Sequence, residues 1–472
     1  MRTRPEQVQA YRFVTRRIVG ALLSGEPESN DQPTRRLGGA LIVSALLAAV
    51  VLAGVGVYGL VSPGGGTVTE GQVVIERESG ARYFYHNKIL YPVLNYASAL
   101  LIAGAGAEVR PVSQASLRDL PRGYPVGIVG APDTLPEHKA LLGLPWSVCT
   151  AVRTRAGNSQ TTAVSVGSAV PGAAPLGGSA LVVVVADGAS RGAKYVLWNN
   201  TRLRVRDNSA LIALDLRTGG VPVGEAFLNA VTVGPEFSAG FVPTSGTAGK
   251  VDGVQGRVGQ VYRTGSQYYV MVNGGGLVQV GEVTARLVLN GASPASVSPG
   301  EVSRLLQQTR LEPAGFPQTA LTARSAPGDD PAVCAEYRGG TDTVTSQTVT
   351  GQTTVQVFDH APTLLSTVDS SAPVGAAGAV RVADRVLVRG GWGALVRDLP
   401  APGVTAATTV YLVTDLGVKY PLVQQGSERD ALAALGYSGV KPVPVPGDLL
   451  ALIPTGPALD PAAARRPVAP VS

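Results

Sequence analysis

The sequence is short of the residues that most catalytic and metal sites require. It has 3 histidines and 2 cysteines in 472 residues, and only 15% of the chain is charged. His86, His138 and His360 are scattered without the spacing of metal ligands. No Walker A pattern occurs, because the nearest string, GTAGKV at 246–251, lacks the first glycine and the hydroxyl residue after the lysine. We therefore expect no catalytic residue, no cofactor and no metal.

Dense positive charge is also missing from most of the chain. The formal charge is +6, but much of it lies in the first 36 residues, and no later Lys/Arg cluster is interleaved with aromatic residues. We therefore expect no nucleic-acid partner. Glycine and proline are by contrast abundant, at 59 and 35 residues. This balance predicts short strands, many turns and proline-rich connections.

One glycine motif invites a cofactor interpretation. Residues 54–59 read GVGVYG, the pattern of a dinucleotide-binding loop, and Glu76 and Glu78 follow about twenty residues later. Such a loop needs a strand before it and a helix after it. Here the motif instead lies in an uncharged apolar run over 37–61, which as a helix is roughly 37 Å long and can cross a hydrocarbon core of about 30 Å. The run predicts a transmembrane helix.

The charges beside this helix predict its orientation. Arginines precede it, and no charge follows until Glu70. Positive charge favours the cytoplasmic side, so we expect the N-terminus inside and the remaining chain outside. The run is too long and starts too late for a cleaved signal peptide, which favours a retained anchor. Cys149 and Cys334 both fall on the predicted outside, where a disulfide can persist. Two separately buried thiols are the alternative.

The N-terminal arm, residues 1–36, begins with a predicted amphipathic helix. Thr3 and Glu6 fit a capping box, and Gly25 supplies a stop. Arginines lie on one side of this helix and apolar residues on the other, with Phe13 as the exception. The apolar side consists of Val8, Tyr11, Val14, Ile18, Val19, Ala21 and Leu22. Such a helix can lie in an anionic leaflet or dock on a partner protein. We expect docking, and a plain positive-inside signal is the alternative.

Two patterns recur four times along the chain. The first is strand-like, with a tyrosine, an apolar residue, two further residues and then Asn or Asp. It occurs as YFYHN from Tyr83, YVLWN from Tyr195, YVMVN from Tyr269 and YLVTD from Tyr411. The second has apolar residues spaced by three, as on one side of a short helix. It occurs as VSQASLRDL from Val112, VGEAFLNAV from Val223, VSPGEVSRL from Val297 and VPGDLLALI from Val445, with Ser113, Ser298 and Pro446 at expected helix starts. The sequence predicts a hairpin-plus-helix unit used four times.

These features divide the chain into domains. The predicted parts are a cytoplasmic arm (1–36), a transmembrane helix (37–61), a linker with repeat 1 (62–136), a connection with the first cysteine (137–180), repeat 2 (181–235), repeat 3 (236–309), a central β-rich domain (310–407), repeat 4 (408–457) and a Pro/Ala-rich tail (458–472). The tail is expected to be extended or disordered. The predicted fold is α+β and β-rich, with a single N-terminal transmembrane helix and an elongated extracytoplasmic domain of four small strand-helix repeats around the central domain.

A second motif, GASRG at 188–192, fits the G-x-S-x-G nucleophile elbow with Ser190 as nucleophile. That elbow requires a strand followed by a helix, whereas LVVVVADGASRGAKYVLW has the pattern of strand, turn and strand. We therefore predict a hairpin turn. Asp329 and Asp330 lie in a Pro/Gly loop and are expected to be solvated.

Several strings in the chain resemble the EccB membrane subunit of the type VII (ESX) secretion systems of actinobacteria. QVQAYRFVTRRIVGAL (7–22) and YGLVSPGG are similar to the start of that family. ARYFYHNKILYPVLNYASALLI, LPRGYPVGIVGAPDTLP and LPWSVC resemble its first repeat and first cysteine. VGQVYRTGSQYYV resembles its third repeat, and YLVTDLGVKYPL, ALAALGY and PTGPALDPAAARRPV resemble its C-terminal end. The resemblance covers most of the chain.

The resemblance implies partners and a disulfide. In that family EccB assembles with the EccC ATPase, EccD and EccE in the membrane, and copies of EccB contact one another outside it. The resemblance pairs Cys149 with Cys334, which would tie a repeat to the central domain. Some members carry an ATPase label, but the chain has no nucleotide motif, so we expect no enzyme.

Three functional hypotheses follow. The leading one is a structural subunit of the secretion machinery in the cell membrane. The alternative is a membrane-anchored, extracytoplasmic module that binds peptidoglycan, with the cell wall as partner. Sugar sites usually stack on exposed rings, and the chain has only Trp146, Trp198 and Trp392, each flanked by core-like residues, which favours assembly. A hydrolase is the third class, and the missing catalytic constellation disfavours it.

Overall fold

The computed structural model of the chain describes residues 4–24, 33–61, 68–104, 109–153, 159–172, 174–216, 218–244, 248–251, 254–325, 331–339, 353–366, 382–399, 409–424 and 430–468. The fold is mixed α+β and strand-rich, as predicted. It has two compact units, one formed by Met1–Tyr91 with Val109–Gly123 and the other by Pro92–Glu108 with Tyr124–Ser472.

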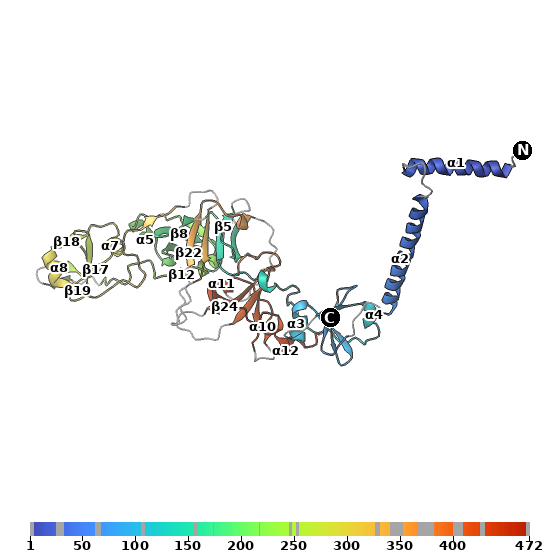
Figure 1. The fold of residues 1–472 in the computed structure, drawn as a ribbon. Coiled ribbons are helices and arrows are strands. Elements are labelled where there is room, and N and C mark those ends of the chain that lie inside the picture. The colour runs from blue at the N-terminus through green and yellow to red at the C-terminus, as the bar shows by residue number, and fades with distance from the viewer. Residues whose placement is uncertain are drawn as a thin grey trace. The chain divides into compact units, whose positions relative to one another are not determined.

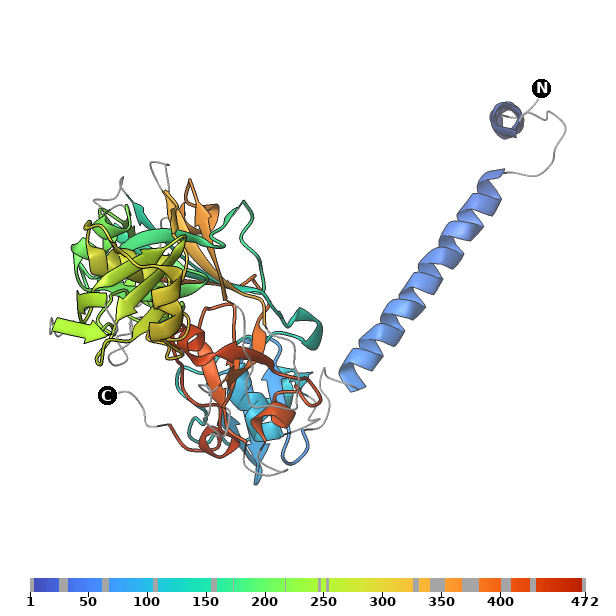
Figure 2. The same cartoon turned by 90° about the vertical axis from the view of Figure 1, so that its left-hand side faces the viewer.

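Two helices open the chain, α1 (Arg4–Ser24) and α2 (Pro33–Val61). Figure 2 shows α2 in blue as one unbroken coil. The GVGVYG motif lies inside α2, so the chain forms no phosphate-binding turn there. The helix starts four residues before the predicted boundary at Leu37. Thr3 and Gly25, the predicted cap and stop of the arm, lie outside the described residues.

Four sheets share one connectivity. In each, three consecutive antiparallel strands form a meander, a helix follows, and a short fourth strand pairs in parallel with the first. The strand orders are β3-β2-β1-β4, β10-β9-β8-β11, β17-β16-β15-β18 and β26-β25-β24-β27. Parallel pairing requires a crossover connection, which explains the helix between the third and fourth strands.

The bounds of these strands are as follows. The first sheet contains β1 (Val73–Glu76), β2 (Arg82–His86), β3 (Ile89–Pro92) and β4 (Arg110–Val112). The second contains β8 (Ser179–Val185), β9 (Lys194–Trp198), β10 (Thr201–Val205), β11 (Val221–Val223) and the additional strands β12 (Thr232–Val233) and β20 (Thr322–Ala323). The third contains β15 (Val261–Thr264), β16 (Gln267–Met271), β17 (Leu277–Val280), β18 (Ala295–Ser296) and β19 (Leu306–Gln307). The fourth contains β24 (Ala394–Leu399), β25 (Val410–Val413), β26 (Lys419–Leu422) and β27 (Val443–Pro446).

Two short helices accompany each of these sheets in the chain. The crossover helices are α3 (Tyr96–Ala103), α5 (Asn208–Ala213), α7 (Glu282–Leu289) and α10 (Ala431–Ala434). The helices after the fourth strands are α4 (Gln114–Leu117), α6 (Glu225–Asn229), α8 (Pro299–Leu305) and α11 (Gly447–Ala451). Ser113, Ser298 and Pro446 are N-caps, where the sequence predicted helix starts, and Ser298 forms a capping box with Glu301.

The sequence predicted only a hairpin and one helix in each of the four repeats. The structure also contains a crossover helix and further strands in each repeat. These elements were not predicted because their residues show no pattern that recurs among the four copies. The recurring tyrosine pattern lies in the second strand of each meander, which is β2, β9, β16 or β25. In the first two sheets it ends in turns with positive φ at Asn87 and at Asn199, which is the turn chemistry that Asn favours.

A fifth sheet joins segments far apart in the sequence, in the order β23-β6-β5-β21-β22-β7. Its strands are β5 (Trp146–Arg153), β6 (Ser159–Val166), β7 (Ala174–Pro175), β21 (Ala332–Tyr337), β22 (Thr353–Phe358) and β23 (Arg385–Leu387). β21 pairs with both β5 and β22, so β5 (teal) and β22 (orange) lie in the same part of the fold in Figure 1. The segment predicted as a connection (137–180) therefore supplies three of the six strands of this central sheet. β24, which falls within the predicted central domain (310–407), instead belongs to the fourth sheet.

The largest hydrophobic core lies on one face of the central sheet. It combines Val148 and Val333 from that sheet with Phe227 from α6 and Leu449 from α11, all buried. The predicted extended tail is also wrong over the described residues. Asp460 caps α12 (Pro461–Ala464), and Ala464 is buried. The remaining elements are η1 (His138–Ala140), α9 (Thr363–Ser366) and the hairpin of β13 (Ala248–Val251) with β14 (Val254–Arg257).

Candidate functional site

The predicted docking arm forms a helix whose apolar side is exposed. The side chains of Tyr11 and Leu22 are 74% and 80% exposed. Val8, Val14 and Ile18 are exposed on the same helix. An apolar stripe of this kind normally packs against another element or a lipid surface. Their role in docking stays a prediction.

The second helix carries the candidate membrane span. Within the described residues one helix, over Gly38–Tyr58, is long and apolar enough to cross a membrane by length and composition. Its leucine and valine side chains are exposed along the whole span, including Leu41, Leu52 and Val57. Apolar side chains exposed around an entire helix are expected in a lipid environment.

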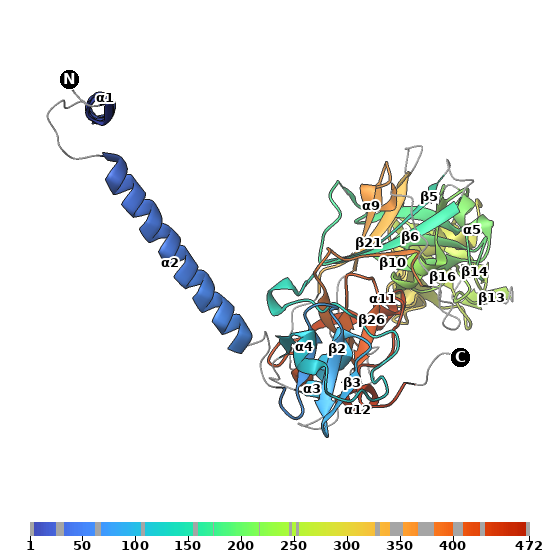
Figure 3. The ribbon, with the colours of Figure 1, turned by 90° about the vertical axis from the view of Figure 1, so that its right-hand side faces the viewer.

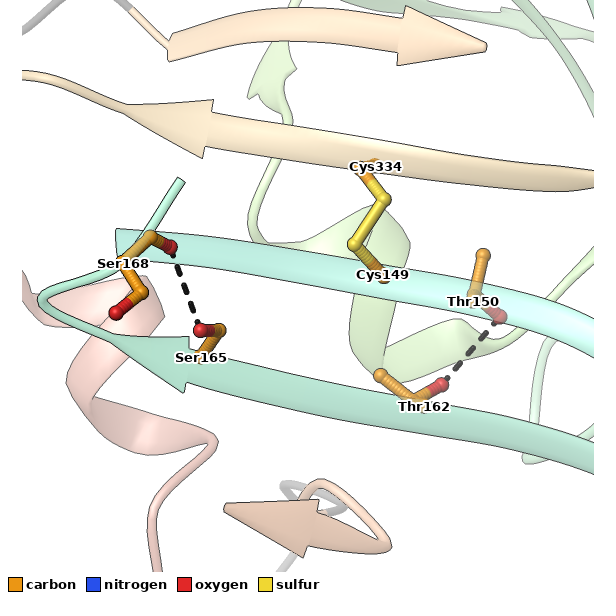
Figure 4. Close-up of a disulfide and its surroundings, with 6 residues drawn as sticks. All are labelled: Cys149, Thr150, Thr162, Ser165, Ser168 and Cys334. Carbon is orange, nitrogen blue, oxygen red and sulfur yellow. Dashed lines mark hydrogen bonds between the residues drawn. A yellow bond between two sulfur atoms is a disulfide. The ribbon is translucent and has the colours of Figure 1, made fainter. Parts of the chain in front are cut away.

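The two cysteines form a disulfide within the central sheet. Cys149 of β5 lies directly opposite Cys334 of β21, and their Cα atoms are 4.0 Å apart. Figure 4 shows the bond running between these two neighbouring strands. Both cysteines are fully buried, in a cluster with Val170, Phe358 and Leu365.

The disulfide lies within one sheet, which differs from the sequence prediction. The bond was expected to tie a repeat to the central domain, but both cysteines belong to one sheet. It joins strands 185 residues apart in sequence, and the second sheet, the third sheet and their helices lie between them in the chain. The disulfide therefore fixes the pairing of β5 with β21 across a long insertion.

The esterase-like motif at Ser190 is a hairpin turn, as predicted, between β8 and β9. The Ser190 hydroxyl donates to Glu225 Oε1 at 2.7 Å, and the backbone N–H groups of Ala189 and Ser190 donate to the same carboxylate. Asp187 in turn accepts from the Glu225 N–H at 2.8 Å. These bonds fasten the turn to the start of α6, so the serine has a structural role.

The three histidines lie in separate places. His86 pairs with Glu70 at 2.6 Å on the surface, His138 hydrogen-bonds to the Gly436 carbonyl, and His360 is exposed. No group of three or more metal-ligating side chains occurs in the part of the chain that the structure describes. In GTAGKV, residues from Ala248 onward form β13, and the acids at 329 and 330 lie outside the described residues.

None of the three tryptophans is exposed. Trp146 is fully buried and donates from Nε1 to the Gly143 carbonyl at 3.1 Å. Trp198 and Trp392 are half-buried. Trp146 therefore presents no ring face on which a sugar ring could stack, and the other two rings are partly covered.

A buried lysine in the fourth sheet was missed by the sequence analysis. Lys419 is 7% exposed, donates from Nζ to the Leu450 carbonyl and lies 5.6 Å from the centre of the Tyr411 ring. Burial lowers the pKa of Lys419 to about 8, while the nearby Asp398 carboxylate opposes that shift. Burial also raises the pKa of Asp398. The available sequence signal was a lysine directly between Val418 and the tyrosine of a predominantly apolar strand.

The buried amine makes stability depend on pH. The unfolded chain binds this proton up to its ordinary pKa of 10.5, whereas the folded chain releases it near 8. Between those values the unfolded state binds more protons, so the free energy of unfolding increases with pH. Relative to Lys419→Met, the native chain should gain about 3 kcal/mol from pH 7.5 to pH 10.5.

Chemical denaturation of both chains at several pH values measures this gain. Lys441→Met, which removes an exposed lysine of the same sheet region, is the matched control and should keep the native slope. A slope for Lys419→Met equal to that of the native chain would contradict the assignment.

These observations define a class of protein: a chain with one candidate membrane-spanning helix whose other described residues form four small α/β sheets of common topology and a disulfide-bonded central sheet. The sequence comparison identifies the family. Residues 1–469 match the model for type VII secretion system ESX-1, transport TM domain B, and the chain belongs to this EccB family.

Known proteins are similar along nearly the whole chain. The ESX-3 secretion system ATPase EccB3 of Mycolicibacterium smegmatis is 28% identical over 470 residues, which cover 96% of this chain and 88% of the relative. A chain in the structure of an intact ESX-5 inner membrane complex matches with a TM-score of 0.66 and 26% identity, over 100% of this chain and 96% of that one. The structure of an EccB3 dimer from the ESX-3 core complex matches with a TM-score of 0.63 and 26% identity, over 84% of this chain and 100% of that one.

Proposed function

We propose that this chain is a structural membrane subunit of a type VII secretion complex, which it anchors and helps to assemble. The observation that carries the proposal is the match of the entire chain to a chain within an intact ESX-5 inner membrane complex. A protein that shares every part of its length with a complex subunit, including the membrane helix, has the parts needed for the same role. The apolar helix over Gly38–Tyr58 supplies the anchor.

The four sheets of common topology are, in this proposal, repeats of one unit. The sequence boundaries are revised so that repeat 4 begins at β24 (Ala394–Leu399) and the central domain includes β5 and β6. Sheets of common topology present repeated surfaces of similar shape, which suits contacts with several copies or subunits.

The partners in this proposal are EccC, EccD, EccE and further copies of EccB. The similarity to an EccB3 dimer supports contact between copies. The exposed apolar side of α1 supports a second contact on the cytoplasmic side, as argued for Val14 and Ile18. Affinity purification of the tagged full chain from native membranes should recover the other subunits in fixed ratio. Recovery of this chain alone under mild detergent would contradict the proposal.

The proposed topology has one crossing with the arm inside. Arginines cluster before the span, so the positive-inside rule places the N-terminus in the cytoplasm. A reporter active only in the cytoplasm should work when fused before Met1 and fail when fused after Ser472. A reporter active only outside is the control and should show the opposite pattern. Cytoplasmic activity from the C-terminal fusion would contradict this topology.

The proposed role is not enzymatic, although relatives such as EccB3 carry the name ATPase. The string closest to a phosphate loop continues into the hairpin strand β13, and catalytic ATP hydrolysis needs a Gly-rich cradle with Mg²⁺ ligands. The purified full chain should therefore release phosphate from ATP at the background rate. A rate that survives repurification and disappears with a point mutation in this chain would show that the chain is an enzyme.

A further inference from the structure

The C-terminal segment packs onto a helix from the beginning of the domain. We call residues 457–468 the C-terminal strap. Within it, α12 packs against α3, and Arg465 donates from Nη2 to the Ile102 carbonyl at the end of α3 at 3.1 Å. Val468 N–H donates to the Pro125 carbonyl at 2.9 Å. Figure 3 shows the red α12 beside the blue α3.

A second segment makes the reciprocal contact. We call residues 124–138 the early strap; it follows α4 in the chain, as the C-terminal strap follows α11. The Tyr437 hydroxyl, just after α10, donates to the Pro136 carbonyl at 2.8 Å, and Tyr437 is 2% exposed. His138 hydrogen-bonds to the Gly436 carbonyl and stacks on the Tyr437 ring.

Each strap also forms an equivalent pair of backbone hydrogen bonds with the third strand of its own sheet and the residues just after that strand. In the early strap, Val126 N–H donates to the Pro92 carbonyl and Val126 accepts from Leu94 N–H. In the C-terminal strap, Leu459 N–H donates to the Pro421 carbonyl and Leu459 accepts from Val423 N–H. Leu459 is fully buried. The straps are therefore structurally equivalent, and each then extends to the other's crossover helix.

The second and third sheets exchange segments in the same way. Phe316, which follows β19, is buried with Leu211 of α5 and Phe237 in the core of the second sheet. Val242, which follows β12, is buried with Val270 in the core of the third sheet. The segment that follows the fourth strand therefore packs on the other sheet of the pair in both cases, for the first and fourth sheets and for the second and third.

We propose that α3, α10 and the two straps form one cooperative unit, and that the C-terminal strap is the clasp that closes it. The proposal does not depend on the secretion role. α3 is an eight-residue helix, and helices this short are marginal without tertiary packing. It therefore needs the covering supplied by α12. A ligand or fusion that displaces residues 457–468, or a protease that cleaves them off, would expose α3 and α10 together, although these helices lie more than three hundred residues apart in the chain.

Hydrogen exchange of the full chain tests the shared opening. Tyr437→Phe removes the hydroxyl bond to Pro136 and should speed exchange about fivefold in 430–437 and equally in α3. Tyr269→Phe, which removes one hydroxyl bond in the third sheet, is the matched control and should leave α3 unchanged. Faster exchange in 430–437 alone would show that the two helices open independently and would overturn the proposal. Equal acceleration in β5 and β21 would overturn it too, because opening would then involve the whole domain.

Truncation tests the clasp separately. A chain that ends at Gly456 should exchange α3 amides about a hundredfold faster, because it loses the packing of α12 on α3 and the hydrogen bond from Arg465 to Ile102, while β5 and β21 keep their protection. A chain that ends at Val468 is the control and should match the full chain. Unchanged protection of α3 in the shorter chain would overturn the assignment of residues 457–468 as the clasp.

Discussion

Removal of the disulfide should cost about 5 kcal/mol of stability and lower the melting temperature by roughly 10 °C. The Cys149–Cys334 bond closes a loop of 185 residues, and in the chain-entropy model a loop this long strongly restricts the unfolded ensemble. The double variant Cys149→Ala, Cys334→Ala removes the bond without adding a buried hydroxyl. Melting of the full chain in detergent, followed by circular dichroism, measures the loss.

Two controls separate the covalent bond from the packing around it. Ala151→Ser places a hydroxyl in the same buried cluster while the bond stays intact, and should cost about 1–3 kcal/mol. Reduction of the native chain should lower its melting temperature to near that of the double variant. Mass spectrometry of non-reduced, alkylated protein provides the direct check. Alkylation of both cysteines without prior reduction would rule the bond out.

Charge on the apolar side of α1 should abolish docking of the arm. In Val14→Asp, Ile18→Asp, two side chains that are more than half exposed in the free helix become charged. If both side chains are buried against a partner, each substitution loses at least about 1.5 kcal/mol of apolar burial. The two losses together lower the affinity for the partner more than about a hundredfold. Co-purification of the EccC subunit with the full chain should therefore fall to background while the chain stays in the membrane.

A matched variant controls for charge and helix propensity. Gln9→Asp, Phe13→Asp adds the same two charges to the opposite side of the same helix and removes a large exposed side chain. It should keep full co-purification. If the two variants behave alike, the apolar side is not the docking surface. If Val14→Asp, Ile18→Asp retains normal recovery of EccC, the docking prediction is wrong.

Local patterns in the sequence predicted the elements that depend on local chemistry. The uncharged run over 37–61 predicted α2, because the length and apolar composition of a membrane-spanning helix can be recognised in the sequence without knowledge of tertiary contacts. Ser298 predicted the start of α8, and the structure shows it in a capping box with Glu301, an interaction that acts over only three residues. The family resemblance, rather than local chemistry, supplied the pairing of Cys149 with Cys334.

Elements held by long-range pairing were not predictable in this way. The central sheet pairs β5 with β21 across almost two hundred residues, and no local pattern specifies such partners. The tail was assigned by its Pro/Ala composition, although Asp460 followed by Pro461 is a helix-start signal. The tertiary contact with α3 makes that weak signal effective. Lys419 was missed because burial of a lysine depends on the helix that covers it.

The state of the membrane complex in cells that lack this chain tests the central claim most directly. Mild detergent extracts from cells with and without the chain are separated by native electrophoresis, and the EccC subunit is detected. A structural subunit should be required for the assembly, so EccC should move from one high-mass band to low mass without the chain and return when the full chain is supplied. A high-mass EccC band of unchanged mobility and amount in the cells that lack the chain would contradict the structural role.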